Sequence, residues 1–170
     1  MGFMGSGKTT TGRLLAARLG WDFLDFDAEV EARSGRSVES FFERGLEDEF
    51  RDLEVRVGRE LLDRRDVVLA SGGGWPCAPG RTPREDQETL SVWLQVDPAT
   101  AVRRVEEAGG GRPLLAGSDP AGRAEELLEK RLRYYGEARL HLDTEGRTPR
   151  EVAEAIARYL SPKEGIRKAE

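Results

Sequence analysis

Apolar residues recur along the chain in two alternating patterns. Short strand-like runs occur at 22–25, 67–71, 91–96 and 140–142, and the run at 67–71 is apolar throughout, as expected for a strand buried on both faces. Between these runs, apolar residues are spaced three and four apart, as in the series Phe50, Leu53, Val57 and Leu61. Such spacing predicts amphipathic helices. Strands that alternate with helices predict an α/β fold, in which helices cover both faces of a central parallel sheet.

Cap signals indicate where two of the helices begin. Asp97 followed by Pro98 is a typical start, because Asp caps the first turn and Pro fits the first helical position. Residues 148–151 form a capping box that opens a final helix through Leu160. Pro162 then prevents the helix from continuing, so we expect one domain over 1–160 and a flexible tail over 161–170.

Composition limits the classes of function that this protein can have. The 170 residues carry a net charge of −5 and contain no apolar run of membrane-spanning length, which predicts a cytoplasmic protein without nucleic-acid or membrane partners. A single cysteine, Cys77, excludes an internal disulfide, and a single histidine, His141, argues against a histidine-rich metal site. We expect a monomer.

The segment 2–9 matches the phosphate-binding pattern G-x-x-x-x-G-K-[ST]. Glycines at such positions let backbone N–H groups surround phosphates, while Lys8 reaches the outer phosphates and the Thr9 hydroxyl can ligate Mg²⁺. The helix that follows directs its positive end at the same anion. The residues expected to bind ATP here are Gly5, Ser6, Gly7, Lys8, Thr9 and Thr10.

Two carboxylates, Asp25 and Asp27, follow the first predicted strand. Alternation along the strand places both on one side, at the edge where the phosphate loop also lies. They suit a metal ion and the recognition of substrate hydroxyls. The alternative is a solvated pair that caps a helix at 27–34.

Two arginines are candidates for binding an anion. Arg51 lies three residues before Glu54 on a predicted helix, so the carboxylate could fix the guanidinium for a carboxylate ligand. The alternative is a solvated ion pair of little energetic value. Arg131 lies in a predicted helix at 120–138 beside Tyr134 and Tyr135, and alone would be a surface residue.

Two glycine-rich segments complete the candidate site. The glycines at 72–74 end a buried strand, where they could admit a substrate to bare backbone or form an ordinary turn. Trp75 could cap the pocket or pack in the core. The glycines at 109–111 precede Arg112, which indicates a mobile flap that delivers this arginine to ATP, or a flexible linker.

Taken in order, these segments resemble shikimate kinase over roughly residues 1–160. The matching elements are the phosphate loop at 2–9, D-x-D at 25–27, F-R-x-x-E at 50–54, Gly-Gly-Gly at 72–74 and R-P-L-L at 112–115. The resemblance implies a three-layer P-loop kinase fold with a substrate-binding region at about 27–60 and a lid at about 109–120.

On the nucleotide side, the resemblance implies that Lys8 and Arg112 act on the ATP phosphates. Thr9 and Asp25 would serve Mg²⁺, with ATP as co-substrate. It also places two further arginines beside the adenine: Arg104 and Arg147.

On the substrate side, the resemblance implies that Asp27 holds the ring hydroxyls of shikimate and orients the attacking one. Arg51 and Arg131 would pair with the substrate carboxylate, and Gly73 and Gly74 would touch the ring. The catalytic residues would then be Lys8, Asp27 and Arg112.

We therefore expect ATP-dependent phosphorylation of the shikimate 3-hydroxyl, a step of aromatic amino-acid biosynthesis. One alternative is another small-molecule kinase, such as a gluconate or nucleoside-monophosphate kinase. A second is a nucleotide-binding protein without turnover. Both give less reason for a set of residues suited to a polyhydroxy carboxylate.

The chain departs from the family pattern in two places. The second carboxylate arginine usually lies in R-x-P-L-Y, whereas this chain has R-L-R-Y-Y at 131–135. The family also carries an apolar strand before the phosphate loop, and this sequence has only Met1 there. We expect a first strand of five or six apolar residues upstream of Met1, because a missing central strand would cost more than a domain's usual stability of about 5–15 kcal/mol.

Overall fold

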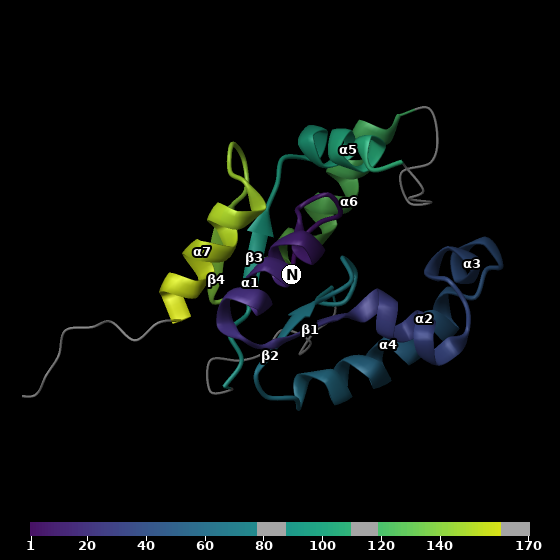
Figure 1. The fold of residues 1–170 in the computed structure, drawn as a ribbon. Coiled ribbons are helices and arrows are strands. Elements are labelled where there is room, and N and C mark those ends of the chain that lie inside the picture. Colours follow the sequence, from purple (N-terminus) through teal and green to yellow (C-terminus); the bar gives the residue numbers. More distant parts are fainter. Residues whose placement is uncertain (78–87, 110–118, 161–170) are drawn as a thin grey trace, which may run out of the picture.

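The computed structural model describes residues 1–77, 88–109 and 119–160 (Figure 1). The elements are α1 (Lys8–Leu19), β1 (Asp22–Asp25), α2 (Phe26–Ser34), α3 (Val38–Glu43), α4 (Glu47–Leu62), β2 (Val67–Ala70), β3 (Val92–Gln95), α5 (Pro98–Glu107), α6 (Pro120–Tyr135), β4 (Leu140–Asp143) and α7 (Pro149–Leu160). The predicted strands and the alternation with helices are thus confirmed, with α6 ending three residues before its predicted boundary.

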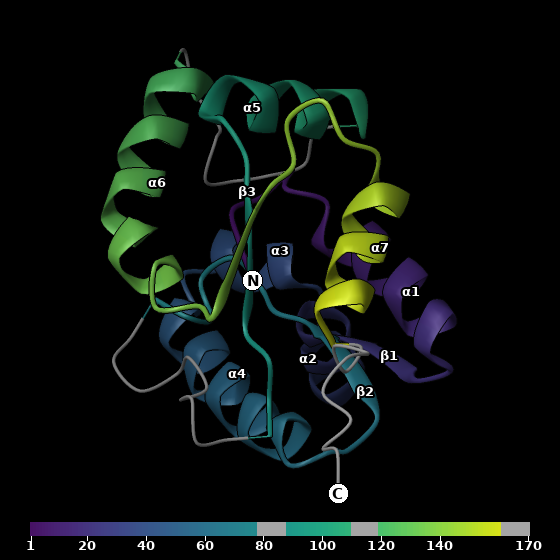
Figure 2. The same ribbon diagram turned by 90° about the vertical axis from the view of Figure 1, so that its left-hand side faces the viewer.

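The described strands form two parallel pairs. In one pair β1 lies beside β2, with Asp25 opposite Ala70, and in the other β3 lies beside β4, with Gln95 opposite Asp143. Figures 1 and 2 show β1 and β2 together with α2, α3 and α4, whereas α5, α6 and α7 accompany β3 and β4. The parallel α/β architecture is confirmed, but among the described residues the expected single sheet is divided into two.

Residues 1–3 lie beside β3 at the division. The Met1 nitrogen donates to the Val92 carbonyl at 2.6 Å, and the Met1 carbonyl accepts from the Leu94 N–H at 3.0 Å. One residue that bonds both neighbours of its partner, here Trp93, follows the pattern of parallel strands. Met1 therefore occupies a strand position at this point.

A groove of about 860 Å³ lies between the two pairs, lined by residues 67–71 of β2 and its end and by residues 88–92 and Leu94 at β3. Each of these strands is paired on one side only among the described strands. A strand that ran into Met1 would fit here and supply hydrogen bonds to both edges. The upstream strand expected from the sequence stays a prediction.

Three apolar clusters form the core. One joins the phosphate loop to α5 and α6 and includes Phe3, Val105 and Tyr135, and another packs α1 against α7 and β3. The third lies beneath α2 and α4 and contains Trp75, whose ring is 5.0 Å from that of Phe26. Trp75 thus packs in the core and does not cap the pocket.

The predicted helix caps are present. The Asp97 side chain accepts from the Ala99 N–H at 2.9 Å, and Thr148 and Glu151 cap each other, with the Glu151 carboxylate 2.7 Å from the Thr148 nitrogen. That backbone hydrogen bond lowers the pKa of Glu151. These caps fix the N-terminal ends of α5 and α7, two of the helices that accompany the second strand pair.

Candidate active site

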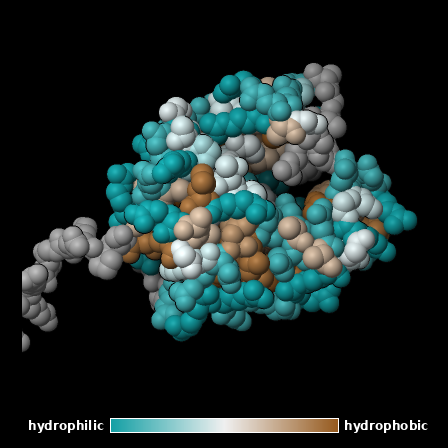
Figure 3. All heavy atoms as spheres, viewed as in Figure 1, coloured by the Kyte–Doolittle hydropathy of each residue, from teal (hydrophilic) through white to brown (hydrophobic). Residues whose placement is uncertain are grey.

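A cavity of about 1130 Å³ lies where the phosphate loop meets the carboxyl ends of β1 and β2. Figure 3 shows a hollow on this face, between the part of the molecule that holds α5 and the part that holds α2 and α3. All described residues that the sequence placed in the site line this cavity: Gly5, Ser6, Gly7, Lys8, Thr9, Thr10, Asp25, Asp27, Arg51, Gly73, Gly74, Arg104, Arg131 and Arg147. Arg112 and most of the expected lid lie outside the described residues.

The phosphate loop has the backbone that its glycines predict. Gly5 and Gly7 have positive φ angles of 71° and 84°, and Gly7 caps α1. A Cβ on Gly5 would lie 2.6 Å from the Ala101 carbonyl oxygen, so only glycine fits against α5. The Lys8 ammonium donates to the Phe3 carbonyl at 2.8 Å. This hydrogen bond fixes the charged end of Lys8 against the loop.

Thr9 and Asp25 bring together two oxygen atoms of the kind that can ligate a metal ion. The Thr9 hydroxyl donates to one Asp25 carboxylate oxygen at 2.8 Å, while the other oxygen accepts from the Asp27 N–H at 3.1 Å. Asp25 therefore also caps α2, as the alternative interpretation held for the pair. Asp27 reaches the cavity from the first turn of α2. The sequence therefore placed this residue at the correct edge of the sheet, but it reaches that edge from a helix and not through strand alternation.

Each of the three glycines after β2 lies against one side chain that the sequence assigned to substrate binding. A Cβ on Gly72 would lie 2.6 Å from the Asp27 carboxylate. A Cβ on Gly73 would lie 3.3 Å from the Arg131 guanidinium, and one on Gly74 would lie 2.7 Å from that of Arg51. The turn at 72–74 is therefore the surface on which the acid and both arginines pack. We call it the glycine turn.

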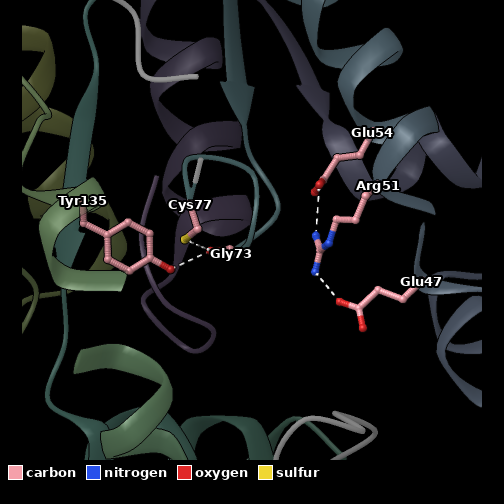
Figure 4. Close-up of polar contacts among 6 residues, drawn as sticks. All are labelled: Glu47, Arg51, Glu54, Gly73, Cys77 and Tyr135. Carbon is pink, nitrogen blue, oxygen red and sulfur yellow. Dashed lines mark hydrogen bonds and ion pairs between the residues drawn. The ribbon is translucent and has the colours of Figure 1, made fainter. Parts of the chain in front are cut away.

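Two carboxylates hold Arg51 (Figure 4). Glu54 lies 3.0 Å from one terminal nitrogen and Glu47 lies 3.2 Å from the other. Glu54 is only 1% exposed, so this pair is not the solvated one that the sequence left open. Burial opposes the charge of Arg51, but Glu54 and Glu47 together raise the pKa of its guanidinium. Glu47 was missed, although its spacing of four residues was a usable signal.

Arg131 is held in the opposite wall and is 9% exposed. One turn further along α6, the Tyr135 hydroxyl donates to the Gly73 carbonyl at 2.6 Å. The unusual Arg133 bonds the Tyr134 hydroxyl at 2.7 Å on the exposed side. The departure from the family pattern at 131–135 thus leaves the buried Arg131 and Tyr135 on the side of the glycine turn.

Arg104 joins the phosphate loop to the end of β4. Its guanidinium donates to the Gly5 carbonyl at 3.2 Å and to the Thr144 hydroxyl and carbonyl at 3.3 Å. The sequence placed Arg104 beside the adenine but did not reveal this bracing of the loop. The adenine contacts of Arg104 and Arg147 stay predictions.

Comparison with known proteins shows which family carries this arrangement. A family model described as "Shikimate kinase" matches residues 4–161. The chain belongs to the shikimate kinase family. A shikimate kinase from Gloeobacter violaceus is 45% identical over 161 residues, which are 95% of this chain and 90% of the relative. One from Moorella thermoacetica is 42% identical, over 94% of each chain.

Solved shikimate kinases share the fold. The enzyme from Acinetobacter baumannii, solved in complex with shikimate, matches with a TM-score of 0.85 at 35% identity, over 93% of this chain and 88% of that one. The enzyme from Bacteroides thetaiotaomicron matches with a TM-score of 0.80 at 31% identity, over 94% of each chain. The family and fold predicted by resemblance are confirmed, which removes support from a gluconate or nucleoside-monophosphate kinase.

Proposed function

We propose that this shikimate kinase uses the cavity to transfer the γ-phosphoryl group of ATP to the 3-hydroxyl of shikimate. The products are shikimate 3-phosphate and ADP, in the pathway to the aromatic amino acids. The observation that carries the assignment of roles is the glycine turn, because it packs against one carboxylate and two arginines beside a phosphate-binding loop. A polyhydroxy carboxylate needs this combination of groups.

The substrate carboxylate is bound by Arg51 and Arg131. The carboxylates that hold Arg51 keep its planar fork in one orientation, which suits paired hydrogen bonds to a carboxylate. Asp27 packs on the same turn. By family resemblance, its carboxylate binds the substrate hydroxyls. These three residues set the ring with its 3-hydroxyl toward the phosphate loop.

The transfer is mainly a matter of position and charge. The 3-hydroxyl oxygen forms a bond to the γ-phosphorus as the bond from that phosphorus to the bridging oxygen of ADP breaks. The hydroxyl proton passes to the Asp27 carboxylate late in the step. Lys8 and, by family resemblance, Arg112 balance the negative charge on the moving phosphoryl group.

Thr9 and Asp25 fit a magnesium ion that accompanies ATP. Their oxygens lie 2.8 Å apart at the phosphate loop, and Mg²⁺ prefers one or two protein oxygens together with phosphates and water. Thr9 and Asp25 would hold the ion, which would supply positive charge to offset the negative charge of the ATP phosphates. The fit rests on the chemistry of these two donors.

A coupled ADP-release assay tests the proposal. We expect rapid ADP formation with shikimate, and background rates with gluconate and with nucleoside monophosphates. Omission of Mg²⁺ should abolish turnover. Comparable rates with gluconate would overturn the substrate assignment, and ATP binding without any acceptor-dependent turnover would favour a non-catalytic protein.

Three further expectations accompany this function. None of the helices in the described segments is long and apolar enough to cross a membrane. A cytoplasmic location, where ATP is formed and used, is part of the proposal. A monomeric state and the division into a substrate-binding region at 27–60 and a lid at 109–120 stay predictions.

A further inference from the structure

The glycine turn has no side chains with which to fix itself. Within the turn, the Gly72 and Gly74 carbonyls accept short-range bonds from the Trp75 and Cys77 N–H groups, both at 3.1 Å. The central carbonyl, that of Gly73, points instead toward α6 (Figure 4). Its position therefore depends on groups outside the turn.

Tyr135 is the main external group that holds this carbonyl. Its hydroxyl donates at 2.6 Å, whereas the Cys77 thiol makes a longer contact of 3.6 Å with the same oxygen. The Tyr135 side chain is fully buried, and its ring lies 5.9 Å from that of Trp93 on β3. Burial raises the pKa of Tyr135, so the phenol keeps its proton and remains a donor at physiological pH.

The same side chain lies next to a substrate-binding arginine. Tyr135 follows Arg131 by one helical turn, and a Cβ on Gly73 would lie 3.3 Å from Arg131 and 3.8 Å from the Tyr135 hydroxyl. The middle glycine is thus enclosed by both residues of α6. A shift of its carbonyl would move the surface on which Arg131, Arg51 and Asp27 pack.

We infer that Tyr135 is a positioning residue for shikimate, which holds the glycine turn by its hydrogen bond to Gly73. It does not touch the reacting atoms. The inference rests on the proposed function, since it assigns the turn to the shikimate side of the cavity. ATP would bind at the phosphate loop, and among the described residues Tyr135 shares an apolar cluster with Phe3 and Met4 of that loop.

Tyr135→Phe tests the inference, because it removes the hydroxyl and keeps the ring. A buried carbonyl left with only the long Cys77 thiol contact should raise the KM for shikimate by about 5- to 30-fold. We expect the KM for ATP to change less than about twofold and kcat less than about threefold. The dissociation constant for shikimate alone, from a calorimetric titration, should rise by the same factor as KM.

Tyr134→Phe is the matched control, since the neighbouring hydroxyl bonds only Arg133 on the exposed side in the described contacts. It should leave both KM values unchanged. Equal KM values for shikimate in the two variants, or an equal rise in both substrates' KM values in Tyr135→Phe, would overturn the positioning role. Absence of shikimate turnover in the unsubstituted protein would instead overturn the proposed function.

A second measurement covers poor folding of Tyr135→Phe. Tetrafluorotyrosine at position 135 keeps the ring and hydroxyl, which faces the Gly73 oxygen, the Arg131 guanidinium and the Cys77 thiol. Its hydroxyl loses the proton more readily and then repels the Gly73 oxygen. The KM for shikimate should rise with pH in this protein and not in one with the same replacement at position 134. A KM for shikimate that stays flat over the pH range in which the absorbance of the fluorinated phenol at position 135 shows loss of its proton would contradict the inference.

Discussion

The space between β2 and β3 differs sharply at its two ends. At the carboxyl ends of the strands it holds the candidate active site, where Thr9, Arg51 and Tyr135 each have a defined partner. At the other end it is a groove of about 860 Å³ between two strand edges. The same two strands therefore border two different spaces, a site that carries polar side chains with defined partners and a groove between strand edges.

The difference shows that contacts outside the groove hold the site. Asp25 is fixed by a helix cap and Thr9, Arg51 by residues of its own helix, and Gly73 by Tyr135. None of these contacts needs a strand in the groove. Sheet pairing supplies stability, whereas helix caps and the glycine turn supply the geometry of the site. The predictions below separate these two contributions.

The largest expected effect is at Asp27. Asp27→Asn removes the carboxylate that orients the hydroxyl and accepts its proton, so kcat should fall by about 100- to 10,000-fold. ATP affinity, measured by titration, should persist. Asp22→Asn, on the exposed start of β1, is the control and should retain activity. A wild-type rate in Asp27→Asn would show that the role given to this carboxylate is wrong.

Arg51→Ala should have the next largest effect on activity. Loss of a charge-assisted carboxylate contact costs about 2–4 kcal/mol, which lowers kcat/KM for shikimate by tens- to several-hundred-fold. The KM for ATP should change little. Arg33→Ala removes a guanidinium bound to Glu60 outside the cavity and should have little effect. Equal weakening of both substrates would indicate a damaged fold.

Filling the groove should change thermal stability more than catalytic activity. A chain extended before Met1 by five or six apolar, β-branched residues should melt at least about 5 °C higher than the 170-residue chain, because the added strand pairs with β2 and β3. An extension of equal length built from Gly and Ser is the control. If both extensions melt alike, and the 170-residue chain is cooperative, monomeric and fully active, the groove does not take a strand.

The last prediction concerns the pH dependence of stability. With Met1 retained as a free terminus, burial and then the charge of Lys8 lower the pKa of its amino group from 8.0 to about 5. Between pH 5 and 8 the unfolded chain binds more protons, so the free energy of unfolding should rise with pH across this window. Urea midpoints at several pH values measure this slope. An apolar extension replaces the amine by an amide and should remove that component; an unchanged slope would contradict the assignment.

Much of this architecture could be predicted from the sequence, because its signals are local. Strand runs, the Thr148–Glu151 capping box and the phosphate loop depend on residues close together in the chain. The contacts of Tyr135 with Gly73 and of Arg104 with Gly5 and Thr144 join residues that are far apart in the chain. The periodicity of apolar residues cannot predict such contacts. Asp27 was placed correctly through a wrong local geometry, since the helix begins earlier than alternation assumed.

Recognition of the substrate carboxylate by Arg51 is the central claim, and one comparison tests it directly. The measurement is kcat/KM for shikimate and for its uncharged methyl ester, in the unsubstituted protein and in Arg51→Ala. The protein should prefer the acid strongly, and Arg51→Ala should lose most of that preference while changing little with the ester. If Arg51→Ala keeps the full preference for the acid, Arg51 does not bind the carboxylate and the site is wrongly assigned.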